Sequence, residues 1–132
     1  MEYSIKLKTL STDTAGKFLG VLMVARNVVH IKHLQSQSFS EHKALDDLYS
    51  ALPDHIDAIA ENYQGRTGTI IEDYNLNSPD VAKKSALEYV KSVRTYVDDN
   101  RKVLGTHSEI QNQVDELVTL LNSTIYKLTN LK

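Results

Sequence analysis

The chain of 132 residues contains no cysteine and no tryptophan, and only two prolines and five glycines. Without cysteine there is neither a disulfide framework nor thiolate metal chemistry, so any metal ligands must be His, Asp or Glu. The scarcity of proline and glycine leaves long stretches free of residues that interrupt helices. Apolar residues make up 41% and charged residues 24% of the chain, which is typical of one globular domain.

Long hydrophobic runs and a strong excess of one charge are also missing. No stretch approaches the ~20 apolar residues of a membrane span, and the first ten residues lack the apolar run of a signal peptide. We therefore expect a cytoplasmic protein without membrane contact. The net charge is -2 and the Lys and Arg residues are scattered singly, whereas phosphate binding needs a concentrated basic surface. At most weak DNA binding is expected.

Apolar residues recur at spacings of three and four in four segments, which is the helical period. This pattern predicts helices over about 14–35, 39–64, 79–104 and 107–131, all within one domain, 1–132. Because each of these helices carries an apolar stripe to bury, we predict an all-α four-helix bundle. In the first helix a second, partly apolar stripe contains Leu19 and Met23, so burial on two faces is expected there.

Several residues predict where the helices begin. Ser38 and Glu41 have the spacing of a capping box, in which each side chain bonds the other residue's backbone amide. Thr106 and Glu109 have the same spacing before the last segment. We therefore expect capped helix starts at both places.

The connection between the second and third helices is the longest one predicted. Gly65 is expected to end the second helix in the left-handed conformation, and Pro79 to open the third. The residues between them are long enough to cross the end of a bundle. The predicted fold is therefore a bundle with a crossover connection between helices two and three.

Three helix-breaking residues lie inside predicted helices. Gly16 and Gly20 are four residues apart in the first helix. They leave two interpretations open, namely close approach of a helix from another subunit and a frayed helix start. Pro53 removes one hydrogen bond from the second helix and predicts a kink there.

Candidate metal ligands concentrate in the first two helices. His42 and Asp46 are four residues apart, as are Asp57 and Glu61, so each pair projects from one helix face. Asp46 and Asp57 are eleven residues apart, roughly 16 Å along a helix axis, so one straight helix cannot bring both pairs to a single ion. A site that uses both pairs therefore requires a second copy of the chain.

The two pairs are arranged symmetrically about a point between Ala51 and Leu52. If two copies of the second helix cross antiparallel at that point, the first pair of one copy faces the second pair of the other. Two identical sites then form across one two-fold interface.

Together with His30, this spacing resembles the ferroxidase centre of the Dps-type mini-ferritins. Their pattern is a His, a second His twelve residues on, an Asp after four more, an Asp after eleven and a Glu after four. Residues 42–50 and 57–61 resemble that family beyond the ligands, and the likeness extends over about 15–65. The implied catalytic and metal-binding residues are His30, His42, Asp46, Asp57 and Glu61.

The resemblance implies a ferritin-like four-helix bundle that binds iron, oxidises Fe(II) with peroxide or dioxygen, and stores or detoxifies iron. It also implies a homo-oligomer, from a two-fold dimer up to a twelve-subunit cage. Imidazole and carboxylate ligands suit Fe(II), although Zn(II) or Mn(II) fit the same set without turnover. The family's basic N-terminal tail is absent here, and Ile31 replaces the aromatic residue that commonly follows the first His.

An alternative function stays open beside the ferroxidase. The short length, Pro53 and the divergent second half favour a non-catalytic structural or partner-binding bundle, for example in a virion. That second half is similar to small ferritin-like proteins encoded by tailed phages. His33 is interpreted as a hydrogen-bonded surface residue rather than an extra ligand. Tyr49 and Tyr63 are interpreted as packing residues, and no role is assigned to His55 or His107.

Overall fold

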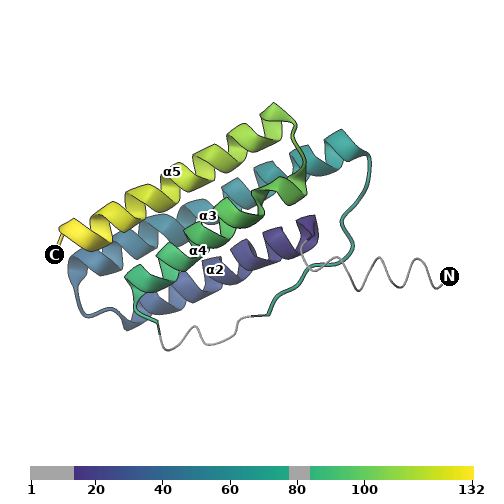
Figure 1. Ribbon diagram of the computed structural model, residues 1–132. Coiled ribbons are helices and arrows are strands. Elements are labelled where there is room, and N and C mark those ends of the chain that lie inside the picture. Colours follow the sequence, from purple (N-terminus) through teal and green to yellow (C-terminus); the bar gives the residue numbers. More distant parts are fainter. Residues whose placement is uncertain (1–13, 78–83) are drawn as a thin grey trace.

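The computed structural model describes residues 14–77 and 84–132, and these form helices joined by turns and one long connection (Figure 1). No strand occurs in this part of the chain. The predicted all-α four-helix bundle is therefore confirmed. Its elements are α2 (Ala15–Gln35), α3 (Phe39–Thr67), α4 (Ala86–Asn100), the short 3-10 helix η2 (Arg101–Leu104) and α5 (Ser108–Asn130).

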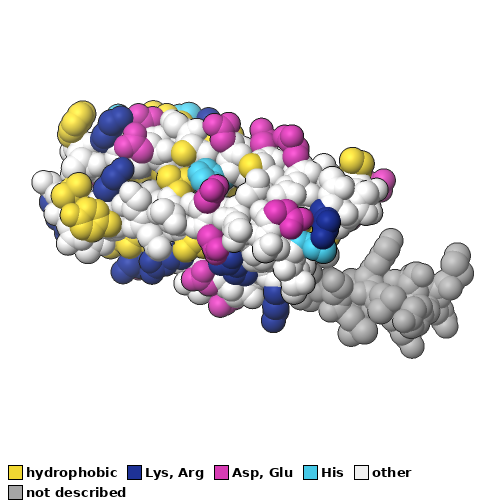
Figure 2. All heavy atoms as spheres, turned by 90° about the horizontal axis from the view of Figure 1, so that it is seen from above, with side chains coloured by type: hydrophobic (Ala, Val, Ile, Leu, Met, Phe, Trp, Pro, Cys, Tyr) yellow, Lys and Arg dark blue, Asp and Glu magenta, His cyan; other side chains and the backbone are white. Residues whose placement is uncertain are grey.

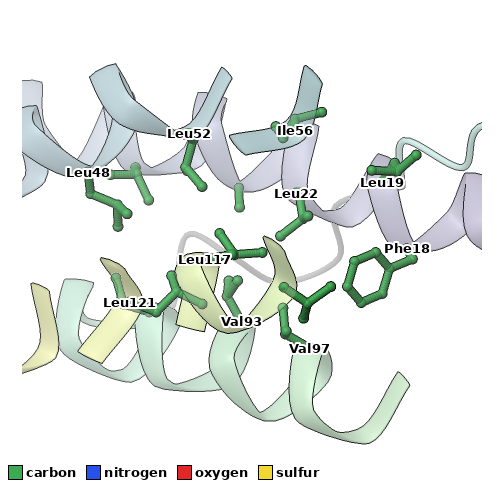
Figure 3. Packing of buried hydrophobic residues seen from close by; sticks show 14 of the residues in the cluster. Phe18, Leu19, Leu22, Leu48, Leu52, Ile56, Val93, Val97, Leu117 and Leu121 are labelled. Atoms are coloured by element: carbon green, nitrogen blue, oxygen red, sulfur yellow. The ribbon is translucent and has the colours of Figure 1, made fainter. Parts of the chain in front are cut away.

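The helices pack around one apolar core. α3 packs against both α2 and α5, and α4 lies mainly on α5. Figure 3 shows apolar side chains from all four helices meeting between these layers. Leu52 of α3 and Leu117 of α5 are fully buried near the middle of the bundle. In α2 both predicted faces contribute, since Phe18 and Leu19 are each 0% exposed.

Gly16 and Gly20 lie beneath the long connection that follows α3. An added Cβ on Gly16 would overlap the carbonyl oxygen of Asp73, and one on Gly20 would overlap that of Asn75. The glycines therefore permit close approach, but the approaching chain is this connection and not a helix of another subunit. The frayed start is also wrong, because the Thr14 side chain accepts a hydrogen bond from the Lys17 amide at 3.1 Å and caps α2.

The described parts of the connection lie beside the two ends of α2. It begins over the first turns of α2, and near the other end the Lys32 Nζ donates a 2.6 Å hydrogen bond to the carbonyl of Lys84. In Figure 1 the part of the connection that follows α3 passes beneath the start of α2. The predicted crossover is therefore confirmed, and it allows α3 and α4 to run parallel.

Helix α4 begins at Ala86, later than predicted. Pro79 lies outside the described residues, and the cap that starts the helix is Ser85, whose backbone is extended. Its hydroxyl accepts from the Glu88 amide and the Glu88 carboxylate accepts from the Ser85 amide, both at 3.1 Å. This capping box satisfies two amides that would otherwise lack partners. It is a stronger start signal than the proline.

The same hydrogen bonds make the Ser85 cap sensitive to pH. The bond from the Ser85 backbone amide, followed by that of the Ser85 side chain, holds the pKa of the Glu88 carboxyl below its ordinary value. A carboxyl with a lowered pKa stabilises the folded state above its unfolded pKa. That contribution is lost as the pH falls through the lowered folded value.

Replacing Ser85 with alanine is expected to lower the free energy of unfolding by about 1 kcal/mol, because an N-cap side chain is lost. Chemical denaturation followed by circular dichroism measures the change. Ser123→Ala is the matched control, since Ser123 is exposed within α5 and does not cap a helix start. Equal stability of Ser85→Ala and the wild type at neutral pH would show that the cap does not stabilise the fold.

Two predicted helix ends need correction. Helix α3 continues through Gly65 to Thr67 and ends at Gly68, which has the left-handed φ of 70°. The capping box expected from Thr106 and Glu109 is wrong, because the N-cap of α5 is His107 and its side chain makes no capping bond.

The turn before α5 is held by a side chain from inside the helix. The Gln111 amide donates to the carbonyls of Arg101 and Gly105 at 2.9 and 2.8 Å. These two bonds satisfy carbonyls at the end of η2, where helical partners run out. The turn is therefore fixed by tertiary contacts rather than by a local cap.

The other predicted features of α3 agree with the structure or stay open. The Ser38 hydroxyl accepts from the Glu41 amide at 3.4 Å, so the predicted helix cap is present. The reciprocal bond of a capping box is not, because the Ser38 amide donates to the Ser36 hydroxyl at 3.3 Å instead. Helix α3 is unbroken through Pro53, and the predicted kink remains a prediction. Among residues 14–77 and 84–132, no helix combines the length and apolar character that a membrane span requires.

Candidate metal site

His30 of α2 stacks on Tyr49 of α3. The ring centroids are 4.2 Å apart and the ring planes are inclined by 11°. The Arg26 guanidinium lies 5.3 Å from the Tyr49 ring centroid, and its Nη1 is 3.4 Å from His30 Nδ1. A guanidinium only donates, so His30 Nδ1 accepts and the ring proton is on Nε2. Binding a metal through Nε2 would require that proton to move.

His42, at the start of α3, is held by the backbone of α2. Its Nδ1 is 2.9 Å from the carbonyl oxygen of His33, and His33 Nδ1 is 2.7 Å from the carbonyl oxygen of His42. The two rings stack with centroids 3.7 Å apart. A carbonyl only accepts, so His42 carries its proton on Nδ1 and the lone pair on Nε2. This is the tautomer that can bind a metal through Nε2.

The surface position predicted for His33 is wrong, although its predicted hydrogen bonding is confirmed. Its side chain is only 8% exposed. The signal for this burial was present in the sequence, because His33 follows Ala25 and Val29 at intervals of four along the buried side of α2. The polarity of histidine concealed a core position.

Asp46 lies one turn beyond His42 on α3. Its carboxylate accepts from the Ser50 hydroxyl at 3.3 Å and is 3.9 Å from Lys43 Nζ. The pKa of the Tyr49 phenol is raised, first by burial and then by the negative charge of Asp46. The Asp46 carboxylate and the Tyr49 phenol are therefore close neighbours on α3.

Asp57 and Glu61 lie further along α3, and both are exposed. Asp57 borders an open groove of about 350 Å³ that is also lined by Met23, Arg26 and Pro53. Arg26 therefore lies beside the groove of Asp57 as well as beside His30 and Tyr49.

The five predicted ligands form two groups on one copy. His30 and His42 approach the same His33 ring, at centroid distances of 6.1 and 3.7 Å. Asp46 is near them, whereas Asp57 and Glu61 lie about three and four helical turns beyond Asp46 along α3. In the described part of one copy, no three His, Asp or Glu side chains are placed to hold one ion. A site shared by two copies stays a prediction.

Basic and acidic side chains alternate over the molecular surface in the view of Figure 2, with no large basic region on that face. Several basic residues are paired with acids: Lys43 and Lys127 approach Asp47, and Arg101 approaches Asp115. This distribution gives no support to strong binding of nucleic acid on that face.

Comparison with known proteins places the chain in a family. Residues 33–128 match DUF5856, which is described as a family of unknown function. The chain belongs to this family. The matched residues include four of the five predicted ligands, and His30 lies just before them.

A relative covers nearly the whole chain. It is an uncharacterized 14.6 kDa protein from the mobD-ri intergenic region of Enterobacteria phage T4, and it is 28% identical over 130 residues. The alignment spans 98% of both chains, so the two proteins correspond over their full lengths. No solved structure matches the chain. The function must therefore be argued from the predicted ligand residues and their neighbours.

Proposed function

We propose that two copies of the chain bind Fe(II) between their α2–α3 grooves and oxidise it with hydrogen peroxide or dioxygen, as the Dps-type mini-ferritins do. The observation that carries the proposal is the arrangement of ligand-type side chains in two groups along α2 and α3. His30 and His42 lie beside the same His33 ring with Asp46 one turn beyond His42, and Asp57 borders the open groove farther along α3. An antiparallel second copy would bring the missing carboxylates to the histidine end.

The donor set suits iron. Imidazole nitrogens bind Fe(II), and three carboxylates offset the additional charge when Fe(III) forms. His42 is already in the tautomer that offers Nε2. Asp46 is held by Ser50 and Lys43, so its carboxylate is positioned rather than free to rotate.

His30 requires a rearrangement before it can bind through Nε2. The bond from Arg26 places its proton on that atom, so the proton must move to Nδ1 and the guanidinium must turn away. At 3.4 Å this hydrogen bond is long and therefore weak. Once free, the Arg26 guanidinium lies beside the groove that Asp57 borders.

Iron is the substrate in this reaction. Two Fe(II) ions lose one electron each, and hydrogen peroxide takes up both electrons with two protons to give two molecules of water. The carboxylates hold the more highly charged product. His42 keeps its Nδ1 proton throughout, because that N–H donates a hydrogen bond to the His33 carbonyl.

Anaerobic addition of Fe(II), followed by peroxide, tests the proposal through the ferric absorbance. His42→Ala is expected to weaken Fe(II) binding by more than about 100-fold, since loss of a ligand exceeds loss of an outer-shell partner. His55→Ala is the matched control, because it removes a histidine from α3 that is not in the ligand set. If the two variants and the wild type oxidise iron alike, the ferroxidase proposal is wrong.

A second candidate is a bundle that acts by binding another protein. It is favoured by large apolar side chains exposed at one end of the bundle, of which Phe39 is 82% and Leu34 68% exposed. Figure 2 shows hydrophobic side chains collected at the end of the molecule where α5 terminates. If the wild-type protein binds no Fe(II) at any ratio of iron to protein, this candidate is the better one.

A further inference from the structure

His33 is the most buried of the polar groups next to the proposed ligands. Its ring is covered on one side by the stacked His42 ring and contacts Tyr49 at a centroid distance of 5.2 Å. Its Nδ1 donates to the carbonyl of His42, so the side chain cannot rotate without losing a buried hydrogen bond. His33 is therefore a fixed element against which His42 rests.

The two hydrogen bonds are reciprocal, and each depends on the other. Helix α2 ends at Gln35, so the His33 carbonyl lies in the last turn, where it accepts a 3.3 Å bond from the Ser36 amide and keeps a lone pair for a second donor. It accepts from His42 Nδ1 because the first turn of α3 is close to it. The His33 side chain holds that turn in place through its own bond to the His42 backbone.

We propose that His33 is a positioning residue that sets the tautomer and ring orientation of His42, so that His42 Nε2 is offered to the metal. The role in metal binding rests on the proposed function, whereas the effect of His33 on the His42 tautomer does not. Free histidine prefers the proton on Nε2, which would block that atom. The stack at 3.7 Å and the reciprocal bonds reverse the preference before any metal arrives.

Two substitutions separate the hydrogen bond from the bulk of the side chain. His33→Leu keeps an apolar side chain in the buried position and removes the donor. His33→Asn places an amide nitrogen near the position of Nδ1 and keeps a donor to the His42 carbonyl. We expect His33→Leu to weaken Co(II) binding by about 10- to 100-fold, in line with the loss of an outer-shell partner, and His33→Asn to recover most of it.

The decisive measurement is the nitrogen NMR spectrum of the His42 ring in metal-free protein, from long-range proton–nitrogen correlations. Wild type and His33→Asn are expected to show the Nδ1-protonated form. His33→Leu is expected to show a mixture in which the Nε2-protonated form dominates. A loss of packing alone would not produce this pattern of loss and recovery.

The outcomes test the positioning role of His33 and the proposed function separately. If wild-type His42 carries its proton on Nε2, or if His33→Leu leaves the tautomer unchanged, the positioning role is wrong. If the tautomer responds as expected but the wild type binds neither Co(II) nor Fe(II), the proposed function is wrong and the positioning of His42 stands. Should His33→Leu fail to fold, the wild-type spectrum still decides between the two tautomers.

Discussion

A mixture of His42→Ala and Glu61→Ala subunits is expected to recover Fe(II) sites that neither variant has alone. In a mixed dimer, one site lacks both side chains and the other lacks neither, because each site takes its histidines from one copy and Glu61 from the other. Random pairing of equal amounts gives mixed dimers in about half of the cases, so about a quarter of the wild-type sites should return. Each variant alone should have none.

The subunits are combined by unfolding them together and refolding, and the intact sites are counted by Fe(II) titration and by the ferric absorbance after peroxide. The matched control mixes His42→Ala with Asp46→Ala. Both substitutions damage the same half of the site, so every site in a mixed dimer remains defective. Equal recovery in the two mixtures, or none in the first, would contradict a site shared between copies.

Gly20→Ala and Gly65→Ala are expected to change stability in opposite directions. Both glycines are helical, and alanine in a helix is favoured by roughly 0.5–1 kcal/mol over glycine. The space beside Gly65 is open, so that gain is realised there. At Gly20 the new Cβ meets the backbone of Asn75, which cannot move aside as the end of a side chain can.

Overpacking of this kind costs about 1–3 kcal/mol, and contact with a backbone carbonyl lies toward the upper end. Because the helical gain is common to both variants, the difference in their free energies of unfolding measures the overlap at Gly20. Urea denaturation of the two variants and the wild type provides these values. A Gly20→Ala variant as stable as Gly65→Ala would show that the crossover does not pack against α2 in solution.

The helices and their buried faces could be predicted because they depend on local periodicity. Stripes such as Phe18 and Leu22 in α2, or Leu48 and Leu52 in α3, repeat at the helical spacing and are buried. Such a face has to be covered whatever the connections between helices are. The crossover could be predicted from the length of the segment between the second and third helices, which is enough to cross the end of a bundle.

The helix ends were harder because several local signals competed. Gly65 and Gly68 are both suitable terminators, and only the second has the left-handed conformation. Thr106 has the correct spacing to Glu109, yet the turn is held instead by Gln111 from one helical turn further on. Spacing rules count neighbours along the chain, whereas these ends are decided by neighbours in space.

The amino-acid sequence by itself determined the all-helical bundle, its core stripes and the two pairs of ligand-type residues on α3, because each follows from periodicity within one helix. Only the tertiary structure decided that the crossover covers Gly16 and Gly20 and that His33 is buried against His42. Those contacts join residues of different elements. Their energy depends on how the helices and the crossover pack, which no spacing within a single helix encodes.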